Sequence, residues 1–438
     1  MKILVITYCF PPDLNPRAFR WGAVAETLRR QGHAVDVVCA SGGAGAETQD
    51  GGVVHRVPDW LSAVKPQGPQ GTQATATQPP RGAKAALKQR LRESLRQLWR
   101  LLRWPDYAMG WVIPAVRAAR RLLRTGRYDW VITVSHPFTG HWVGMLALKG
   151  PAGPRWLVDI GDPFHLMPDP APNNQTLYGR LNRWVEARLL ARADAVSVTT
   201  DTTRALYEAH FPAAVSKIRV IPPLLSLPRP PEPVAPRSDG IIRLVFAGTL
   251  YRNLRSPKFL IACLEGLIAA APALPLELHF YGAVNDCGPD LGACSVQAKA
   301  RIHIHGLVAR EVAARAMAEA DVLVNIGNKS ESQLASKVVE YMTSGRPILN
   351  LTSIDLDTSG EALGDYPTLT IRESSAGPEP QVVDQLLEFV RNPPIVAPEY
   401  AERVRESFSA GRIAGMYESV IQDFREVSRR HDSDGTVR

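Results

Sequence analysis

Proline divides the chain into two stretches that repeat one pattern. Seven of the fifteen residues from Pro222 to Pro236 are proline. Such a segment cannot form a helix or a central strand, so we interpret residues 223–237 as a semi-rigid linker. On each side of it, apolar runs of strand length alternate with segments of helical periodicity. This alternation predicts an α/β protein with two Rossmann-like domains, each a parallel sheet covered by helices, and an interdomain cleft.

The strands of the two predicted sheets are short apolar runs bounded by turn residues. We expect six of them before the linker, at residues 2–8, 34–40, 129–135, 155–162, 193–200 and 217–223. Five more follow it, at residues 241–250, 274–284, 301–308, 320–327 and 347–353. The sequence therefore predicts an N-terminal domain at 1–222, a C-terminal domain at 238–398 and a long C-terminal helix at 399–430.

The charge and the cysteine content narrow the choice of partner and compartment. Lys and Arg number 51 against 43 Asp and Glu, and the net charge of +8 favours anionic partners such as nucleotides, phospholipids or nucleic acid. The five cysteines are scattered, without a C-x-x-C pair or a histidine cluster at metal spacing, which predicts a reducing compartment and no structural zinc. No apolar run approaches the length of a transmembrane helix, and residues 3–10 are too short for a signal peptide core.

An insertion in the first domain combines two unusual segments. Residues 62–85 are rich in Pro, Gly, Gln and Thr and are predicted to be disordered. Between Arg81 and Arg103, eight basic side chains accompany a single acid, and leucines recur at helical spacing over residues 86–103. A basic face, an apolar stripe and the flanking Trp99 and Trp104 are typical of a helix that lies on an anionic membrane. The alternative is a helix that packs on its own domain with its basic face in water.

Two motifs in the second domain suit a nucleotide diphosphate. The first places Gly248 directly after a strand, and Arg252, Arg255 and Lys258 follow it at the start of a helix. A close backbone approach, clustered cations and a helix N-terminus can together hold a diphosphate. The alternative is a solvated basic turn.

The second motif is the helical segment ASKVVEYMTSGRPI at residues 335–348. Lys337 and Glu340 lie on one helix face, where the cation can meet phosphate and the carboxylate can accept hydrogen bonds from two ribose hydroxyls. A surface ion pair is the simpler alternative. Neither a G-x-G-x-x-G nor a G-x-x-x-x-G-K-[ST] motif follows a strand, which counts against dinucleotide oxidoreductases and P-loop NTPases.

In combination these stretches resemble the GT-B glycosyltransferases of the large family 4 class, over essentially the whole chain. The matching segments of the first domain are ITYCFPPDLNPRAFRW, SHPFTGHWVGMLALK and WLVDIGDPF. Those of the second domain are VFAGTLYRNLRSPK, IHIHGLVAREVAARAMAEADVLVNI and ASKVVEYMTSGRPIL. The resemblance implies a retaining, metal-independent hexosyltransferase-type enzyme without a cofactor, which uses a nucleotide-diphosphate sugar as co-substrate.

The resemblance assigns donor binding to the second domain. It implies that Arg255, with Arg252 or Lys258, holds the diphosphate, that Lys337 contributes to phosphate binding, and that Glu340 binds the ribose. The remaining donor-site positions carried over are Gly248, Thr249, His305, Gly306 and Leu307, the last three of which would line the base. Two features depart from the family pattern, because Thr249 stands where many members have arginine and Ser332 stands in place of the first of two glutamates.

The resemblance places the acceptor mainly in the first domain, where polar residues follow three of the predicted strands. We predict His136, Asp162 and Arg17 as catalytic residues, and Asn15, His141 and Asp159 as acceptor-binding residues. The alternatives are an arginine in a solvated loop, a histidine that caps a carbonyl and an aspartate at a helix N-cap.

These features predict sugar transfer to a hydroxyl of a lipid-linked or oligosaccharide acceptor in cell-surface polysaccharide assembly, such as that of bacterial lipopolysaccharide. The predicted basic helix places the enzyme in the cytoplasm, peripherally on the inner face of the cytoplasmic membrane. Two alternatives remain: a sugar-nucleotide 2-epimerase, which uses no acceptor, and a non-catalytic membrane-peripheral scaffold with a vestigial GT-B fold. Nucleic acid is not expected as a partner, because the basic residues gather on one leucine-striped helix without aromatic stacking platforms.

Overall fold

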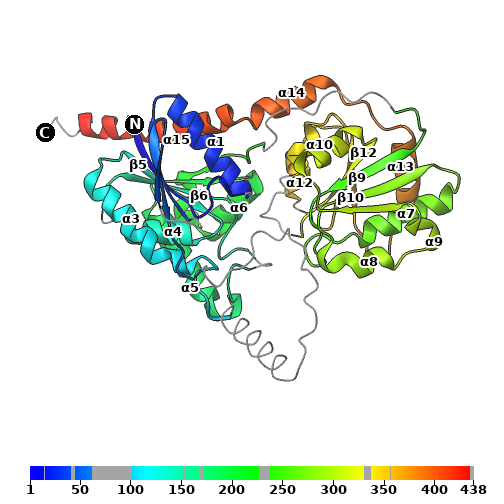
Figure 1. Cartoon of the computed structure of the whole chain (residues 1–438), viewed down its shortest axis with the longest axis horizontal. Coiled ribbons are helices and arrows are strands. Elements are labelled where there is room, and N and C mark those ends of the chain that lie inside the picture. Colours follow the sequence, from blue (N-terminus) through cyan, green and yellow to red (C-terminus); the bar gives the residue numbers. More distant parts are fainter. Residues whose placement is uncertain are drawn as a thin grey trace. The chain divides into compact units, whose positions relative to one another are not determined.

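The computed structural model describes residues 1–13, 15–40, 45–61, 101–148, 150, 153–167, 171–225, 237–329, 337–355 and 357–434 (Figure 1). The chain divides into two compact units: unit 1 comprises Met1–Pro222 and Ala410–Arg438, and unit 2 comprises Pro223–Ser409. Among the described residues, no helix is long and apolar enough to cross a membrane. The predicted disordered insertion, most of the predicted basic helix and most of the linker lie outside the described residues.

Unit 1 is built on an eight-stranded sheet in the order β3-β4-β2-β1-β5-β6-β7-β8. All neighbouring strands pair in parallel except β3 and β4. The order reverses between β1 and β5, and segments that follow strands at such a reversal are where sheets of this kind bind ligands. The strands are β1 (Lys2–Ile6), β2 (Ala34–Ala40), β3 (Gly45–Gln49), β4 (Gly52–Val57), β5 (Trp130–Ser135), β6 (Arg155–Ile160), β7 (Ala195–Val198) and β8 (Ile218–Val220).

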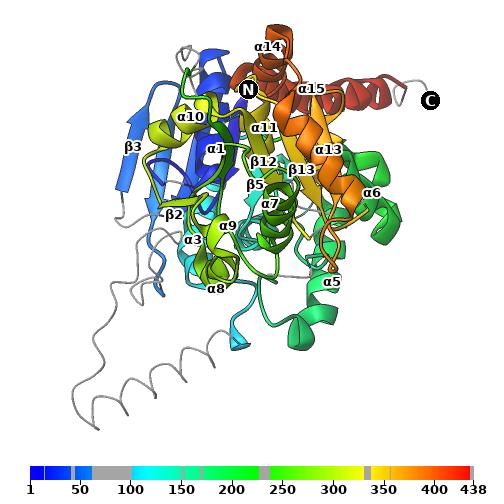
Figure 2. The same cartoon turned by 90° about the vertical axis from the view of Figure 1, so that its right-hand side faces the viewer.

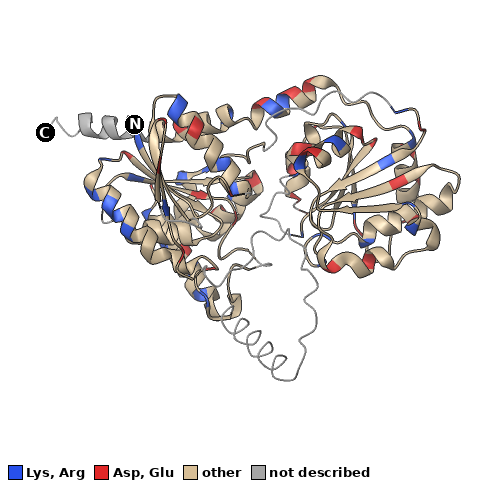
Figure 3. Ribbon diagram, viewed as in Figure 1, with Lys and Arg blue, Asp and Glu red and all other residues tan. Residues whose placement is uncertain are grey.

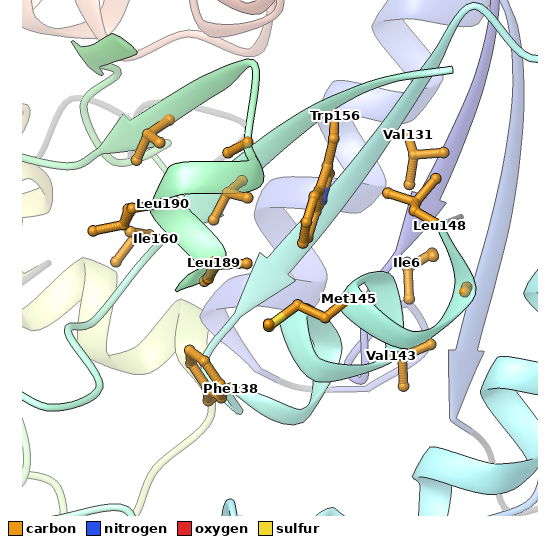
Figure 4. Close-up of a cluster of buried hydrophobic side chains, with 14 of the residues drawn as sticks. Ile6, Val131, Phe138, Val143, Met145, Leu148, Trp156, Ile160, Leu189 and Leu190 are labelled. Atoms are coloured by element: carbon orange, nitrogen blue, oxygen red, sulfur yellow. The ribbon is translucent and has the colours of Figure 1, made fainter. Parts of the chain in front are cut away.

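The helices of unit 1 bury the apolar residues of this sheet. Figure 4 shows part of the core, where Trp156 and Val131 of neighbouring strands lie near Met145 and Leu189 of the covering helices. The described helices are α1 (Pro16–Arg30), η1 (Met109–Trp111), α3 (Val112–Thr125), α4 (Thr139–Ala147), α5 (Gln175–Arg192), α6 (Asp201–His210), η2 (Pro212–Lys217) and α15 (Ala410–Asp434).

The C-terminal region forms two helices, where the sequence predicted a single one over residues 399–430. The first, α14 (Pro398–Ser407), belongs to unit 2, whereas α15 belongs to unit 1. A tight turn separates them, since the N–H of Ser409 bonds to the carbonyl three residues back, at Glu406. In unit 1, α15 packs along α1, and the ring of Tyr417 lies 5.0 Å from that of Trp21.

Unit 2 contains six parallel strands in the order β11-β10-β9-β12-β13-β14, with the reversal between β9 and β12. The strands are β9 (Ile242–Ala247), β10 (Leu276–Tyr281), β11 (Ile302–Gly306), β12 (Val322–Ile326), β13 (Ile348–Thr352) and β14 (Thr368–Arg372). Numbered within the unit, this is the order 3-2-1-4-5-6 of a dinucleotide-binding fold. The two predicted Rossmann-like domains are therefore confirmed at the level of each unit.

Helices α7 (Lys258–Ala270) and α13 (Pro380–Arg391) run side by side in unit 2 (Figure 2). Gly266 permits this contact, because a Cβ at this position would lie 2.8 Å from the side chain of Val383. The other described helices of the unit, besides α14, are η3 (Asn285–Cys287), α8 (Gly288–Gly292), α9 (Val296–Lys299), α10 (Arg310–Glu319), α11 (Lys337–Met342) and α12 (Thr358–Leu363).

Candidate active site

The segments that follow the strands of unit 2 are tied together where the strand order reverses. The N–H of Gly248, after β9, bonds to the carbonyl of Tyr281, and the N–H of Gly282 bonds to the carbonyl of Gly306, both at 2.8 Å. Gly282 has a φ of +130°, and a Cβ there would lie 2.0 Å from the carbonyl oxygen of Gly248. Only glycine allows this close approach. The loops after β9, β10 and β11 are thereby held at one edge of the sheet.

Arg255 lies at the reversal and joins the two strands that flank it. Its guanidinium donates to the carbonyl of Thr249, after β9, at 3.2 Å and to Oδ1 of Asn328, after β12, at 2.7 Å. Its Nε is buried without a hydrogen-bond partner, and no carboxylate within the described ranges forms an ion pair with it. Burial lowers the pKa of this guanidinium, but arginine keeps its charge at neutral pH. Arg255 is therefore a fixed cation with unused hydrogen-bonding capacity.

The other two cations of this motif already have a carboxylate partner. Nε of Arg252 lies 3.0 Å from Asp290 Oδ2, and Nζ of Lys258 lies 3.7 Å from Oδ1 of the same residue. The Lys258 side chain is 64% exposed, so its charge is also well solvated. Of the three predicted diphosphate ligands, Arg255 is thus the one that is partly buried and has no carboxylate partner among the described residues.

Helix α11 supplies Lys337 and Glu340, and the structure brings their charged groups into contact. Glu340 is only 5% exposed, so this is not an ordinary surface ion pair. Arg310, the first residue of α10, places a second cation 3.7 Å from the other carboxylate oxygen of Glu340. Tyr341 fixes the helix, because its hydroxyl accepts from the N–H of Ala247 at 2.7 Å and donates to the carbonyl of that residue at 3.1 Å.

The predicted base-lining residues lie at the end of β11 and just beyond it. The ring of His305 stacks on that of Tyr281, with centroids 4.1 Å apart and planes 4° from parallel. Gly306 has a φ of +67°, a left-handed conformation that favours glycine, and the following Leu307 is half exposed. This segment therefore presents a flat aromatic group and an apolar side chain next to the strand ends.

In unit 1, the structure brings together two of the three predicted catalytic residues. Asn15 caps α1 by accepting the N–H of Arg17 at 2.8 Å. The guanidinium of Arg17 reaches Asp162, after β6, with a separation of 3.7 Å between Nη2 and Oδ2. Gly161 makes room for it, since a Cβ at that position would lie 1.8 Å from the guanidinium carbon. Arg17 is therefore held over the carboxyl end of β6, and is not the solvated loop arginine of the alternative.

His136 follows β5, on the other side of the reversal from β1. The side chain is partly buried, and its ring lies 5.6 Å from that of Tyr107. Because β1, β5 and β6 are parallel, His136 and the Arg17–Asp162 pair lie on the same side of the sheet, beyond the carboxyl ends of these strands.

The other two predicted acceptor-binding residues, His141 and Asp159, lie in the core of unit 1. His141 is 1% exposed, with Nδ1 2.8 Å from Thr133 Oγ1, and burial lowers the pKa of its imidazole to about 3. Asp159 is also 1% exposed and is fully engaged by hydrogen bonds within the unit. Asp159, on β6, turns to partners inside the unit, as polar side chains of strands covered on both faces do. His141, on α4, is buried beside Thr133, and its Nε2 has no hydrogen-bond partner among the described residues. Acceptor contacts at these two positions stay a prediction.

Comparison with protein families identifies both units. Residues 18–223 match the glycosyl transferase 4-like domain, and residues 242–358 match the glycosyl transferases group 1 domain. The structure of Anabaena Alr3699/HepE in complex with UDP-glucose is similar over 97% of this chain and 100% of that one, with a TM-score of 0.55 and 13% identity. Glycosyl transferase domains thus make up most of the chain, which belongs to the glycosyltransferases.

Other solved structures share the fold of this glycosyltransferase. The lipopolysaccharide outer core galactosyltransferase WaaB has 12% identity and a TM-score of 0.56, and the similarity covers 97% of this chain and 99% of that one. The α,α-trehalose 6-phosphate synthase from Burkholderia multivorans has 12% identity and a TM-score of 0.57, with 98% and 99% covered. At these identities the likeness shows the fold alone. No curated protein sequence matches the chain.

Sequence reasoning missed Arg310 and Asn328, two residues that follow strands of unit 2. Each lies shortly after a predicted strand, Arg310 after β11 and Asn328 after β12. Their position after a strand could have indicated them, since ligand-contacting residues of a parallel sheet follow its strands. Their partners, Glu340 and Arg255, are distant in sequence, and the sequence gives no indication of these pairings.

Proposed function

We propose that this glycosyltransferase moves a hexosyl group from a nucleotide-diphosphate sugar to a hydroxyl of a saccharide acceptor, with retention of configuration. The observation that carries the proposal is Arg255, a partly buried cation without a carboxylate partner among the described residues, fixed at the reversal of strand order in unit 2. A diphosphate would supply the missing anion. HepE, which shares the fold, has been solved with UDP and with UDP-glucose.

The proposed reaction needs no protein nucleophile. The acceptor oxygen forms a bond to the anomeric carbon on the face from which the diphosphate leaves, and the bond from that carbon to the phosphate oxygen breaks. The departing phosphate oxygen takes the acceptor proton. Arg255 and Lys337 stabilise the negative charge that develops on the diphosphate, so the chemistry of the leaving group requires no metal ion. Glu340 accepts hydrogen bonds from the ribose, while His136 and the Arg17–Asp162 pair orient the acceptor.

Donor binding is the first test of this proposal. Wild-type protein is screened against UDP-, GDP-, dTDP- and CMP-sugars by differential scanning calorimetry. We expect one nucleotide class to raise the unfolding temperature, and at a ligand concentration of about 100 Kd the gain is about 2.7 kcal/mol. Glu340→Gln, which keeps the shape of the side chain, should lose most of this gain. If none of the four nucleotide classes raises the unfolding temperature of the wild type, the result contradicts the proposal and favours the non-catalytic scaffold.

Transfer itself separates an enzyme with an acceptor from an epimerase. Incubation of the bound sugar nucleotide without an acceptor should return it unchanged apart from slow hydrolysis, whereas an epimerase would convert it to a second sugar nucleotide. Proton NMR of the anomeric position in the transfer product then reports whether configuration is retained.

We further propose that the acceptor is lipid-linked and that the enzyme works on the cytoplasmic face of an anionic membrane in cell-surface polysaccharide assembly. Support comes from α5, which exposes Leu177, Leu181 and Trp184 at helical spacing. Arg180, Arg183 and Arg188 are exposed on the same helix, and its single acid, Glu186, is buried. Basic residues lie along α3 and α5 (Figure 3). Apolar side chains interleaved with arginine suit the surface of an anionic leaflet.

Vesicle sedimentation tests the role of α5. The triple variant Leu177→Ser, Leu181→Ser and Trp184→Ser should bind vesicles that contain phosphatidylglycerol at least about tenfold more weakly than wild type. Each substitution removes an apolar side chain worth roughly 1.5 kcal/mol or more when buried in the interface. The matched control is Val296→Ser with Ile395→Ser, which removes two exposed apolar side chains of unit 2. Equal sedimentation of the triple variant and wild type would remove α5 as a membrane contact.

A further inference from the structure

Two histidines and a glutamate meet on one face of the unit 2 sheet, next to His305. His279 of β10 pairs in register with His303 of the edge strand β11, and Glu277 precedes His279 by two residues on the same face. The Nε2 atom of His279 lies 3.0 Å from Glu277 Oε2, and that of His303 lies 3.7 Å from Glu277 Oε1. The three side chains thus converge on one point, with one donor atom from each within 4.8 Å of the others.

His303 has a donor atom that nothing in the described chain satisfies. Its Nε2 is buried and has no hydrogen-bond partner among the described residues, since the 3.7 Å to Glu277 is too long for a hydrogen bond. A buried polar atom of this kind is uncommon in native structures and calls for a ligand. The atom points to where the other two donor groups meet.

His305 contacts His279 at the ring nitrogen that does not face Glu277. Its Nε2 lies 3.0 Å from Nδ1 of His279, which leaves Nε2 of His279 facing Glu277. A hydrogen bond on the far nitrogen is what orients a metal-binding imidazole in known sites. The rings of His279 and His303 stack with centroids 4.6 Å apart, which keeps both planes in place.

We propose that Glu277, His279 and His303 bind one divalent transition-metal ion of the zinc class. Two imidazoles and one carboxylate form a known three-ligand set for zinc, with water at the fourth position. Ligand atoms at about 2.0–2.2 Å from a tetrahedral ion lie roughly 3.3–3.6 Å apart. The two histidine Nε2 atoms lie 3.0 and 3.7 Å from the nearest oxygen of Glu277, each from a different oxygen of the carboxylate, and both distances are close to this range. Imidazole ligands favour such an ion over magnesium or calcium.

The charged groups around Glu277 are compatible with a bound metal ion. Arg243 Nε lies 3.6 Å from Glu277 Oε2, but Arg243 also pairs with Asp239 at 2.7 Å, so its charge does not depend on Glu277. The side chains of Glu277 and His303 are 27% and 39% exposed, which leaves a path from solvent. The sequence predicted no histidine cluster at metal spacing, and this group escapes such a search because its members come from two strands more than twenty residues apart.

The ion would join the edge strand β11 to β10 through side chains. His305 and Tyr281, which stack at the end of these strands, follow the proposed ligands by two residues each. A metal that fixes β11 would therefore also fix the predicted base-lining segment. Metal binding itself does not depend on the proposed transfer reaction, and it is measured without substrate.

Metal titration of the full chain, prepared without a histidine tag and treated with EDTA, tests the proposal. We expect one Zn²⁺ per chain by calorimetric titration, and Co²⁺ should give the intense visible absorption of a tetrahedral site. Zn²⁺ should raise the unfolding temperature of the wild type, whereas Mg²⁺ should not. His279→Gln and His303→Gln should each weaken Zn²⁺ binding by about 100-fold, because each removes a direct ligand.

The control is His210→Gln, which removes a histidine whose contact lies on the surface of α6 and should leave Zn²⁺ binding unchanged. Unfolding of each variant in EDTA shows whether it remains folded without metal. Absence of Zn²⁺ binding by the wild type overturns the proposal whatever the variants do. Binding that persists in both histidine variants also overturns it, because the ion would then sit elsewhere.

Discussion

Replacement of Arg255 by methionine is expected to reduce kcat/KM for the sugar nucleotide by about 10²–10³-fold while leaving the protein as stable as before or more so. The first effect follows from the loss of a preorganised cation at a developing negative charge. The second follows from the surroundings of Arg255, whose partly buried charge is met by one carbonyl and one amide oxygen and by no carboxylate among the described residues. Removing a partly buried charge that has no anionic partner relieves a desolvation cost.

The opposite directions of the two effects make this experiment specific. An arginine with a structural role would lose stability and activity together. The matched variants Arg252→Met and Lys258→Met remove cations that pair with Asp290, and each should change kcat/KM by less than about tenfold. Activity within tenfold of wild type for Arg255→Met, or a larger loss at Arg252, would show that another cation holds the diphosphate.

The sequence could predict the central strands of both sheets because their burial on both faces requires continuous apolar runs. It did not predict β3, β4 or β14. The sequences of β3 and β14, GAETQ and TLTIR, lie at the edges of the sheets and are largely polar, and β4 (GVVHRV), next to β3, is mostly only partly buried. Their positions depend on pairing with a neighbouring strand, which local composition does not encode. The break between α14 and α15 was missed for a similar reason, since each helix packs in a different unit.

At the candidate site, the sequence located residues near strand ends but did not indicate the direction of their side chains. Arg17 and Asp162 approach each other at the edge of the unit 1 sheet, whereas His141 and Asp159, chosen by the same rule, turn into the core. The difference depends on partners that are remote in sequence, such as Tyr417 for Asp159. A position at the end of a strand therefore predicts a site residue less reliably when the contact partner of its side chain is unknown.

Asp159 holds the C-terminal helix against the core of unit 1. Its carboxylate accepts hydrogen bonds from Trp21 Nε1 at 2.8 Å and from the hydroxyl of Tyr417 at 2.7 Å, and Arg20 Nε lies 4.0 Å away. Arg20 is 2% exposed and also donates to the hydroxyl of Tyr417 and to the carbonyl of Ile221, so α1, α15 and the segment after β8 meet in one network. Without the carboxylate, the Arg20 charge would be buried without an anion.

We expect Asp159→Ala to lower the free energy of unfolding of unit 1 by about 3–5 kcal/mol, the usual cost of breaking a buried ion pair. Tryptophan fluorescence during urea unfolding measures this directly, because all nine tryptophans of the chain belong to unit 1. With a slope of roughly 2–3 kcal/mol per M, the midpoint should fall by about 1.5 M. The control Asp201→Ala removes an exposed carboxylate paired with Arg204 and should change the free energy by less than about 1 kcal/mol.

A double variant distinguishes the buried network from an acceptor contact at Asp159. If the cost arises from the unpaired Arg20, then Asp159→Leu combined with Arg20→Met should be more stable than Asp159→Ala, since apolar replacement of both partners removes the stranded charge. An acceptor-binding role predicts the reverse pattern, in which Asp159→Ala raises the KM for the acceptor while the urea midpoint stays within about 0.3 M of wild type. That result would show that Asp159 contacts the acceptor. A large fall of the urea midpoint in Asp159→Ala that is smaller in the double variant would instead show that Asp159 attaches α15 to unit 1.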